Sequence, residues 1–533
     1  MKNLFLAAFV LAGALALSLG AQALDPAKLL QPPTDAWPTY NGDYTGRRYS
    51  PLKQINQANV NTLNLAWTRR FTAGGGRGGG GAVQIKATPL AVNGILYFAA
   101  PDNAWAVDAR SGRELWRFTW ETKGGLHIGN RGFGMYGDWL YFETPDCYLI
   151  SLDAKTGKMR WNHQIAEVKR EYFCTPAPLV IKNHIITGVG GDSLDLPGYL
   201  ESRDPETGAL QWRWNTTPRP GEPGAQTWPS KEAMEHGGGM TWLSGTYDPE
   251  LNLYYLGTGN PNPVYAPQSR SGSNLYTCSI VALNPDTGKM AWYYQVSPHD
   301  THDWDNVETP VLIDGQFNGQ PRKMLAQAAR NGYFVLLDRT NGKNLLTAPF
   351  VEGLNWAKGL DAEGRPIPNP DMEAKTDGTL VSPTEGGAAN WFAPSFSPAT
   401  GLFYTHASES YGMDWKTDTS KTPEGYGGRN QAIWAQNVLQ AIDYKTGKIV
   451  WSHRYPNQGG NRSGLLTTAG GLLFGGDPTS NVFAMDPANG KMLWHAGLQS
   501  SVSNGPITFE MDGRQYLVVG AGDSLYAFTL PGH

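Results

Sequence analysis

Three oxygen-bearing side chains in the middle of the chain could together bind a hard metal ion. Asn260 follows a Gly-Thr-Gly sequence, and Asp303 and Asp305 lie two residues apart further along the chain. Amide and carboxylate oxygens are the ligands that hard cations prefer, and an ion of higher charge favours additional negative charge. A carboxylate at such a centre could also act as a general base. The alternative is that Asp303 and Asp305 are ordinary turn or strand-end residues.

Two histidines in the same segment suggest a different chemistry, a transition-metal site. His299 and His302 are close together in the sequence. Imidazole binds zinc and similar ions well, but such a site needs at least three protein ligands, and no third one is clear. Ordinary packing roles for both histidines are therefore the favoured interpretation.

A sequence motif that is repeated along the whole chain indicates the fold that positions these side chains. With small variations it reads apolar-x-Asp-x-x-Thr/Asn-Gly-x-x-x-Trp, and it occurs seven times. Asp and Thr/Asn-Gly form a hairpin turn in which Gly supplies the positive φ, and the next strand delivers a Trp that can pack between neighbouring sheets. The copies end at Trp116, Trp161, Trp212, Trp292, Trp451 and Trp494, and the copy at Asp338 lacks its Trp.

The spacing of the repeat predicts the fold. In four cases neighbouring Trp residues, counted from Trp67, lie 43 to 51 positions apart, which fits one four-stranded blade of a β-propeller. Trp67 looks like the end of an eighth copy, and the last strand, 524–530, could pair with it and close the ring. The sequence therefore predicts an all-β, eight-bladed β-propeller with Trp-containing repeats, as a single domain over residues 24–533.

The spacing between copies is longer in two places, from 212 to 292 and from 292 to 451. These stretches predict blades with loop insertions, and inserted loops usually carry function. Within the second stretch, residues 352–388 are rich in Pro, Gly and charge and are expected to form a long ordered loop or lid.

Composition and charge exclude some classes of function. Charged residues make up 17% of the chain, the net charge is −4 and the pI is near 6.2. No basic field is available to hold nucleic acid or an anionic membrane.

The N-terminus has the pattern of a secretory signal peptide. Lys2 gives a positive start, 4–19 is an apolar run, and Ala-Gln-Ala at 21–23 is a cleavage site of the usual type. The alternative, a retained membrane anchor, is disfavoured because the run is short for a bilayer span. We therefore expect residues 1–23 to be removed and the protein to be periplasmic, without stable membrane insertion.

The chain has three cysteines, Cys147, Cys174 and Cys278. An odd number in an oxidising compartment leaves at least one thiol free, and the sequence does not decide which cysteines pair. The chain contains no Cys-x-x-Cys-His sequence, so we expect it to carry no c-type haem of its own.

Several longer segments carry more specific information. They are Trp-Pro-Thr-Tyr-Asn-Gly at 37–42, Tyr-Ser-Pro-Leu at 49–52, Gly-Thr-Gly-Asn-Pro at 257–261, Pro-His-Asp at 298–300, Asp-Trp-Asp at 303–305 and Arg-Asn-Gly at 330–332. In combination they resemble the pyrroloquinoline quinone (PQQ) dependent methanol and ethanol dehydrogenases. The resemblance covers nearly the whole chain after residue 23, and it implies an eight-bladed propeller with a central cofactor pocket.

The resemblance implies roles for individual residues. Asn260 matches an amide metal ligand, Asp303 matches the catalytic carboxylate, which also binds the metal, and Asp305 matches an extra carboxylate of the lanthanide-using branch. Arg330 matches the arginine beside the reactive quinone carbonyl, and Trp242 matches the Trp that stacks under the quinone, where a flat indole suits a flat ring. The other implied contacts to the cofactor are Arg131, which pairs with a carboxylate, and Thr175, Gly191 and Asn390.

The sequence departs from the family pattern at three places. Gly and Leu at 125–126 stand where the family has adjacent cysteines in a vicinal disulfide, and Ser193 stands where it has a metal-binding Glu. Asp192, or the nearby Asp195, could replace that Glu as a ligand. Lys86 stands where the family has a glutamate near the cofactor, and its charge could help to bind PQQ, a tricarboxylate.

The resemblance implies a periplasmic PQQ-dependent alcohol dehydrogenase that uses Ca²⁺ or a lanthanide ion. Asp303 would take the proton of a small alcohol, hydride would pass to the quinone, and Arg330 would stabilise charge on the adjacent oxygen. Without a haem motif, electrons would pass to an external acceptor such as a cytochrome c. The alternative is a non-catalytic propeller that has lost PQQ and serves as a binding or scaffold module. Similar Trp-containing repeats also occur in outer-membrane assembly lipoproteins, although no lipobox Cys follows the signal peptide here.

Overall fold

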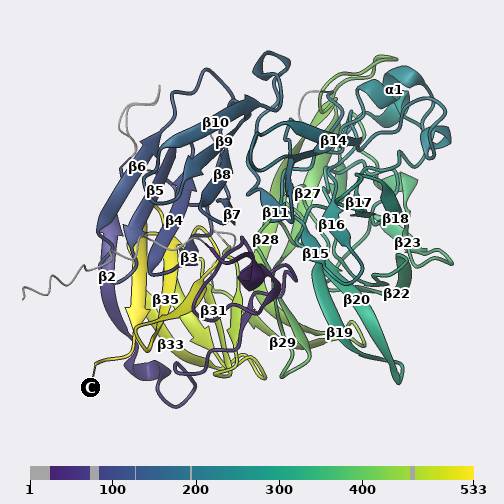
Figure 1. Cartoon of the computed structure of the whole chain (residues 1–533). Coiled ribbons are helices and arrows are strands. Elements are labelled where there is room, and N and C mark those ends of the chain that lie inside the picture. The colour runs from purple at the N-terminus through teal and green to yellow at the C-terminus, as the bar shows by residue number, and fades with distance from the viewer. Residues whose placement is uncertain (1–23, 73–82, 127, 192–194, 457–461, 533) are drawn as a thin grey trace, which may run out of the picture.

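The computed structural model describes residues 24–72, 83–126, 128–191, 195–456 and 462–532. The predicted signal peptide, Asp192 and Ser193 lie outside these residues. The described residues form six four-stranded sheets, two five-stranded sheets and one two-stranded sheet, and they contain a single α-helix, α1 (Lys231–Glu235) (Figure 1). The all-β propeller class that the repeat predicts is confirmed.

Five of the four-stranded sheets are each built from four consecutive antiparallel strands. Their strands are β3 (Leu90–Val92), β4 (Ile95–Ala100), β5 (Asn103–Asp108) and β6 (Glu114–Thr119); β7 (Gly134–Tyr136), β8 (Trp139–Glu143), β9 (Tyr148–Asp153) and β10 (Met159–Gln164); β11 (Leu179–Ile181), β12 (His184–Gly188), β13 (Tyr199–Arg203) and β14 (Leu210–Asn215); β15 (Thr246–Asp248), β16 (Leu253–Gly257), β17 (Ser279–Leu283) and β18 (Met290–Gln295); and β19 (Val311–Phe317), β20 (Gln320–Ala328), β21 (Tyr333–Asp338) and β22 (Lys343–Pro349).

The two five-stranded sheets extend this plan by one strand each. One contains β25 (Thr379–Val381), β26 (Ser395–Ser397), β27 (Leu402–Lys416), β28 (Gly428–Asp443) and β29 (Ile449–Arg454), and the other contains β1 (Tyr49–Ser50), β30 (Leu466–Thr468), β31 (Leu472–Gly476), β32 (Asn481–Met485) and β33 (Met492–Gly497). The two-stranded sheet pairs β23 (Ala357–Leu360) with β24 (Pro366–Pro368), and the short 3-10 helices are η1 (Pro26–Leu30), η2 (Val60–Thr62), η3 (Val168–Arg170), η4 (Ala225–Thr227), η5 (Pro267–Ser269) and η6 (Pro370–Met372).

The remaining sheet joins the two ends of the chain. β2 (Asn64–Arg70) pairs antiparallel with β36 (Ser524–Thr529), which continues to β35 (Arg514–Ala521) and β34 (Ile507–Met511). Trp67 lies opposite Ala527 in this register. The purple β2 therefore lies beside the yellow C-terminal strands (Figure 1). The predicted closure of the ring by the last strand is confirmed.

The repeated sequence motif has a clear physical basis. In one copy, Asp153 Oδ1 accepts hydrogen bonds from the backbone N and the Oγ1 of Thr156, at 2.7 and 2.8 Å, which fixes the turn. Gly157 then takes a φ of +69°, and a Cβ placed on it would lie 2.6 Å from the ring of Trp116 in the preceding sheet. The indole of one copy therefore covers the turn glycine of the next, so this glycine has no room for a side chain.

The same contact recurs around the ring, with glycines 112, 208, 288, 342 and 490 facing Trp67, Trp161, Trp212, Trp292 and Trp451. Leu346 stands where the copy at Asp338 lacks its Trp, and Leu346 and Ala348 fill the space against Gly447. The missing Trp is thus replaced by two smaller apolar side chains at one junction.

The longer spacings contain the expected insertions. Helices η4 and α1 lie between β14 and β15, and residues 352–388 contain β23, β24 and β25. Strands β27 and β28 have 15 and 16 residues and form one long hairpin, whose outer part pairs with β25. This hairpin extends well beyond the three-residue β26 beside it.

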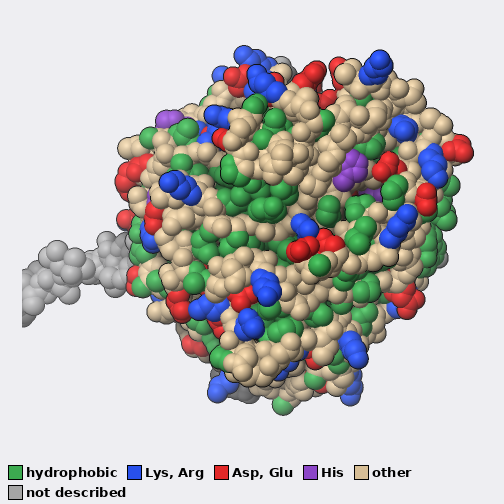
Figure 2. All heavy atoms as spheres, turned by 90° about the vertical axis from the view of Figure 1, so that its right-hand side faces the viewer, with side chains coloured by type: hydrophobic (Ala, Val, Ile, Leu, Met, Phe, Trp, Pro, Cys, Tyr) green, Lys and Arg blue, Asp and Glu red, His purple; other side chains and the backbone are tan. Residues whose placement is uncertain are grey.

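The cysteine pairing that the sequence leaves open is resolved by the structure. Cys147 and Cys174 form a disulfide with a Cα–Cα distance of 5.1 Å, and Cys278 is a buried free thiol. In the described part of the chain, every helix is too short or too polar to cross a membrane. Figure 2 shows one face of the molecule, on which acidic and basic side chains are interspersed.

Substituting a turn glycine tests the contact between neighbouring sheets. Gly157→Ala is expected to lower the free energy of unfolding by about 2–4 kcal/mol. Alanine would have to adopt the unfavourable positive φ, and its Cβ would clash with Trp116. Gly513→Ala is the matched control, since Gly513 has a φ of +72° and open space around its Cβ position. Its cost should be only about 1–2 kcal/mol. Equal losses in denaturant unfolding of the two variants would contradict this account of the repeat.

Candidate active site

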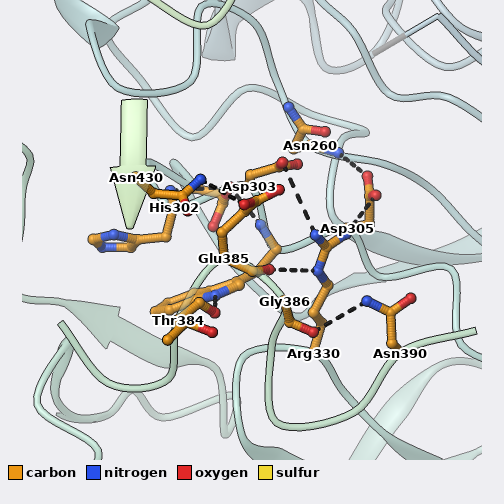
Figure 3. A network of polar contacts seen from close by, with 12 residues as sticks. Asn260, His302, Asp303, Asp305, Arg330, Thr384, Glu385, Gly386, Asn390 and Asn430 are labelled. Carbon is orange, nitrogen blue, oxygen red and sulfur yellow. Dashed lines mark hydrogen bonds and ion pairs between the residues drawn. The ribbon is translucent and has the colours of Figure 1, made fainter. Parts of the chain in front are cut away.

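The predicted catalytic residues meet around one buried arginine (Figure 3). Arg330 Nη1 donates a hydrogen bond to Asp305 Oδ2 at 2.8 Å, and its Nη2 lies 3.9 Å from Asp303 Oδ2. Only 7% of Arg330 and 2% of each aspartate are exposed. Burial alone lowers the pKa of Arg330, but the charges of Asp303 and Asp305 outweigh this effect and raise it well above its usual range. Arg330 therefore stays charged and compensates two carboxylates away from water.

The connectivity of the sheets explains why these residues meet. In an antiparallel sheet, the loop that enters the first strand and the loop between the second and third strands lie at the same end. Asp303 and Asp305 lie in the loop that enters β19, and Arg330 lies in the loop between β20 and β21. Asn260 lies in the corresponding loop between β16 and β17 of the neighbouring sheet. The same end of the propeller therefore collects all four side chains.

The backbone at Asp303 adopts an uncommon conformation. Its φ is +64°, in the left-handed region that residues other than glycine rarely occupy. Such conformations persist where the surrounding structure determines them, and they cluster at functional sites.

Asp305 connects the predicted metal ligands to the predicted cofactor wall. Its Oδ1 accepts from Asn260 N at 2.8 Å, and its Oδ2 accepts from Trp242 Nε1 at 3.1 Å. The side-chain oxygen of Asn260 is buried and makes no hydrogen bond within the described residues. A buried amide oxygen without a donor is costly, and a hard cation satisfies such an oxygen. The residues present therefore fit a metal ion beside Asp303 and Asp305. The remaining predicted ligand, Asp192, lies outside the described residues.

A second part of the network contains the predicted cofactor contacts. The Arg131 guanidinium lies 4.7 Å from the ring centroid of Trp242 and 5.0 Å from that of Trp391. Thr175 Oγ1 donates to Trp242 O at 3.2 Å, and Thr175 O accepts from Arg131 N at 3.1 Å. Burial lowers the pKa of Lys86, and so does the nearby charge of Arg131. Two basic residues thus lie at this end of the site, where they suit a ligand that carries carboxylates.

Two other predicted cofactor contacts lie at the edge of this network. Asn390 Nδ2 donates to Gly386 O at 3.1 Å, in the segment whose Glu385 O accepts from Arg330 Nε. Gly191 is buried with a φ of +140°, and its nearest side chains belong to Tyr172, Met240 and Leu196. Contacts between neighbours thus link the other predicted site residues that the structure describes into one group, whereas the side chains nearest to Gly191 do not belong to that group.

The two histidines have separate partners. His302 Nδ1 lies 3.0 Å from Asp414 Oδ2, and its ring packs on Trp304 with centroids 4.4 Å apart. His299 Nδ1 lies 2.7 Å from Gly272 O. No cluster of three or more His, Cys, Asp or Glu side chains around one point occurs in the described ranges. The favoured interpretation, ordinary packing roles for both histidines, agrees with this geometry.

The departure at 125–126 has a structural reason. Gly125 has a φ of +80°, and a Cβ on it would lie 1.9 Å from Pro145 O, so a side chain is excluded there. Asp146 instead fixes this loop, because its carboxylate accepts from Lys123 N and Trp120 Nε1, both at 3.0 Å. The neighbouring Cys147 then ties this corner to Cys174, next to Thr175.

Sequence reasoning misses three residues of this site. Glu308 is 3% exposed, and its burial raises its pKa to about 8. Glu385 follows Thr384 in the segment before β26, and Trp391 contacts Arg131. Trp391 directly follows Asn390, so it could have been inferred as a neighbour. Glu308 and Glu385 stand in no spacing pattern that marks them.

Comparison with known proteins identifies the family. The family model described as the glucose/ethanol/alcohol dehydrogenase β-propeller domain, named for PQQ, matches residues 37–352, more than half of the chain. The chain belongs to the PQQ-dependent alcohol dehydrogenase family. A second model, for the outer membrane protein assembly factor BamB, matches residues 405–532, which contain the last two copies of the repeat.

Individual PQQ-dependent dehydrogenases resemble the chain over most of its length. The quinoprotein alcohol dehydrogenase PedH of Pseudomonas putida is 36% identical over 559 residues, which cover 98% of this chain and 92% of the relative. The crystal structure of the quinohemoprotein alcohol dehydrogenase of Comamonas testosteroni has a TM-score of 0.85 and 34% identity, and it covers 94% of this chain and 81% of that chain. A europium-containing methanol dehydrogenase has a TM-score of 0.83 and 29% identity, with 95% and 99% covered.

Two adjacent glycines offer a test of the Arg330 position in this PQQ-dependent dehydrogenase. Gly387 has a φ of +74°, and a Cβ on it would lie 2.0 Å from Arg330 Cγ. Gly387→Ala should therefore displace Arg330 and lower kcat/KM for alcohol oxidation by about 10-fold or more. Gly386→Ala is the control, because its Cβ would meet only Thr384 Oγ1, at 3.7 Å. Equal rates in a dye-linked assay of the two variants would show that Arg330 tolerates displacement.

Proposed function

We propose that this member of the family oxidises a small alcohol with PQQ and a metal ion held at the Arg330 site. The observation that carries the proposal is the contact between Trp242 Nε1 and Asp305. Through it, a chain of contacts joins the basic, aromatic end to the acidic end: a cation–π contact of Arg131 with Trp242, hydrogen bonds at Asp305, and the ion pair of Arg330 with Asp303. A tricarboxylate with a flat ring fits the first end, and a hard cation fits the second.

The proposed ligand sets follow from this division. Asn260, Asp303 and Asp305 would hold the metal ion, with Asp192 as a further ligand. Trp242 would stack on the PQQ ring, and Arg131 would pair with one of its carboxylates, which Lys86 also attracts. The other proposed contacts to the cofactor are Thr175, Gly191, Arg330 and Asn390.

The protein's own groups would carry the proton and the charge. PQQ and its metal ion, when bound, would supply the hydride acceptor for the alcohol carbon. Asp303 would act as the general base for the alcohol hydroxyl. Arg330 is held by Asp305 and by Glu385 O, so it would present a fixed positive charge where negative charge develops. Its burial makes that charge effective, because little water screens it.

The proposal also covers the metal ion, the electron acceptor, the number of blades and the cellular location. The extra carboxylate at Asp305 favours a lanthanide over Ca²⁺, since it adds negative charge for a trivalent ion. Electrons would leave to an external acceptor such as cytochrome c, which the family resemblance implies. The six four-stranded and two five-stranded sheets support a count of eight blades over residues 24–533. The pattern of residues 1–23 supports export to the periplasm.

Removing the charge of Asp303 tests its role as the base. Asp303→Asn should keep PQQ bound and lower turnover by about 10²–10⁴-fold, the usual contribution of a positioned base. Asp248→Asn is a matched control, because Asp248 is 3% exposed and pairs with Arg339 at 2.7 Å in a different part of the propeller. It should lose stability but keep turnover. Unchanged activity of Asp303→Asn, with PQQ absorbance and dye reduction measured together, would refute the assignment.

The choice of metal is tested by titration with Ca²⁺ and La³⁺. The wild-type protein should bind PQQ in a metal-dependent way and prefer La³⁺. Asp305→Asn keeps a hydrogen-bond acceptor for Arg330 but loses a negative charge, so it should weaken La³⁺ at least about 10-fold more than Ca²⁺. Equal weakening of the two ions, followed by quinone absorbance, would mean that Asp305 serves Arg330 and not the metal.

A further inference from the structure

The segment between β25 and β26 forms a fixed wall beside Asp303 (Figure 3). Three consecutive carbonyl oxygens of this segment accept hydrogen bonds from site residues. They are Thr384 O from Trp304 Nε1 at 3.0 Å, Glu385 O from Arg330 Nε at 2.9 Å, and Gly386 O from Asn390 Nδ2 at 3.1 Å. Ala388 N also donates to Arg330 O at 2.8 Å. The backbone of Glu385 is therefore held in place relative to Arg330.

The Glu385 side chain lies on the same side of the wall as Asp303 (Figure 3). Its Oε2 accepts a hydrogen bond from Asn430 Nδ2, and the same nitrogen lies 2.9 Å from Tyr265 Oη. Within the described residues no hydrogen bond reaches its other oxygen, Oε1. Glu385 and Asn430 are only partly buried. One oxygen of this carboxylate is thus fixed by the protein, and the other is available to a ligand that enters from solvent.

The surroundings of this carboxylate are acidic. Asn430 and Asp414 lie opposite each other on the outer part of the long β27–β28 hairpin, and Tyr265 accepts a hydrogen bond from Asn430. Burial raises the pKa of Tyr265, and the charges of Asp303, Asp414 and Glu385 raise it further. The positive charge of Arg330 is shared among Asp305, Asp303 and Glu385. The wall beside the proposed base therefore presents one hydrogen-bond acceptor, Glu385 Oε1, in surroundings where carboxylates outnumber the arginine.

Such a wall is a poor match for a purely aliphatic alcohol. An alkyl chain against Glu385 would remove water from a carboxylate without giving it a hydrogen bond in return, which is costly. An ionised carboxylate accepts hydrogen bonds and donates none, so the matching group on the substrate has to be a donor. Hydrogen bonds to a charged group are also the stronger ones.

We propose that Glu385 selects alcohols that carry a second hydrogen-bond donor, a hydroxyl or an ammonium group, near the hydroxyl that is oxidised. This inference rests on the proposed function: the reacting hydroxyl lies at Asp303 while Glu385 Oε1 accepts from the second group. Glu385 is a specificity residue in this scheme, because it binds the part of the substrate that does not react. Diols and amino alcohols share the required chemistry.

The test compares alcohols of matched chain length, with two to four carbons. Each series contains the simple alcohol, the diol and the amino alcohol, for example 1-butanol, 1,4-butanediol and 4-amino-1-butanol. The wild-type holoenzyme should prefer one or both donor-bearing alcohols by about 10-fold or more in kcat/KM, mainly through KM, as expected for a hydrogen bond to a charged group.

Variants of Glu385 separate the two kinds of donor. Glu385→Gln keeps an acceptor oxygen and loses the charge, so it should remove most of a preference for amino alcohols and less of a preference for diols. Glu385→Leu should remove both. Glu352→Gln is the control, because Glu352 is an exposed glutamate in the same insertion between β22 and β26, and it should keep the wild-type preference.

The outcomes distinguish this inference from the proposed function. If the wild-type protein, loaded with PQQ and metal, oxidises no alcohol, the proposed function itself fails. If it oxidises simple alcohols equally well, or if the preference survives in Glu385→Leu, the function stands and the inference is overturned. A loss of metal affinity in Glu385→Gln that accounts for the whole change in rate would also overturn it, because Glu385 would then be a metal ligand.

Discussion

The contact of an indole with a turn glycine is the constraint on which the propeller depends. At six junctions a Trp lies over the turn glycine of the next copy, as Trp116 does over Gly157. At five junctions the indole nitrogen also donates to a backbone carbonyl in the next turn, so each contact fixes an orientation as well as a separation. A sheet held in this way at its edge delivers its entering loop and its central loop to one end of the ring, and the active-site loops all lie there.

Arg330 organises that end of the molecule. Its side chain compensates Asp303 and Asp305, and its backbone and Nε hold the segment that carries Glu385. A buried ion pair contributes little net stability, because desolvation offsets the attraction, and its value here lies in the geometry that it imposes. Trp242 donates a hydrogen bond to Asp305 and packs against the guanidinium of Arg131, so it connects the two ends of the site. The acidic and basic ends of the site are thus parts of one arrangement.

The sequence predicts the fold well because the repeat is local. Each Asp-to-Trp motif encodes its own turn, and the spacing between motifs indicates how many residues one sheet contains. The propeller and its closure through Trp67 could therefore both be inferred. The site residues Asn260, Asp303 and Arg330 could be named because they lie in segments that resemble a family. Glu385 could not, because its environment is built from Asn430 on a distant hairpin and from Arg330 in another sheet. The loop at Gly125 was expected to lack a disulfide, but its attachment to Asp146 depends on contacts that no local pattern marks.

The sheet that contains both β2 and β36 sets an order for assembly. During synthesis β2 emerges early, and it has no partner strand until nearly the whole chain has been made. The hairpins of the sheets form from neighbouring strands, but the pairing of β2 with β36, like that of β1 with β30, has to form across most of the chain, which is entropically demanding. Until β2 and β36 pair, each of the two sheets that flank this one lacks a packed neighbour on one side. The ring therefore closes late, when β2 and β36 pair. A pocket formed by loops from several sheets reaches its final shape only after this pairing.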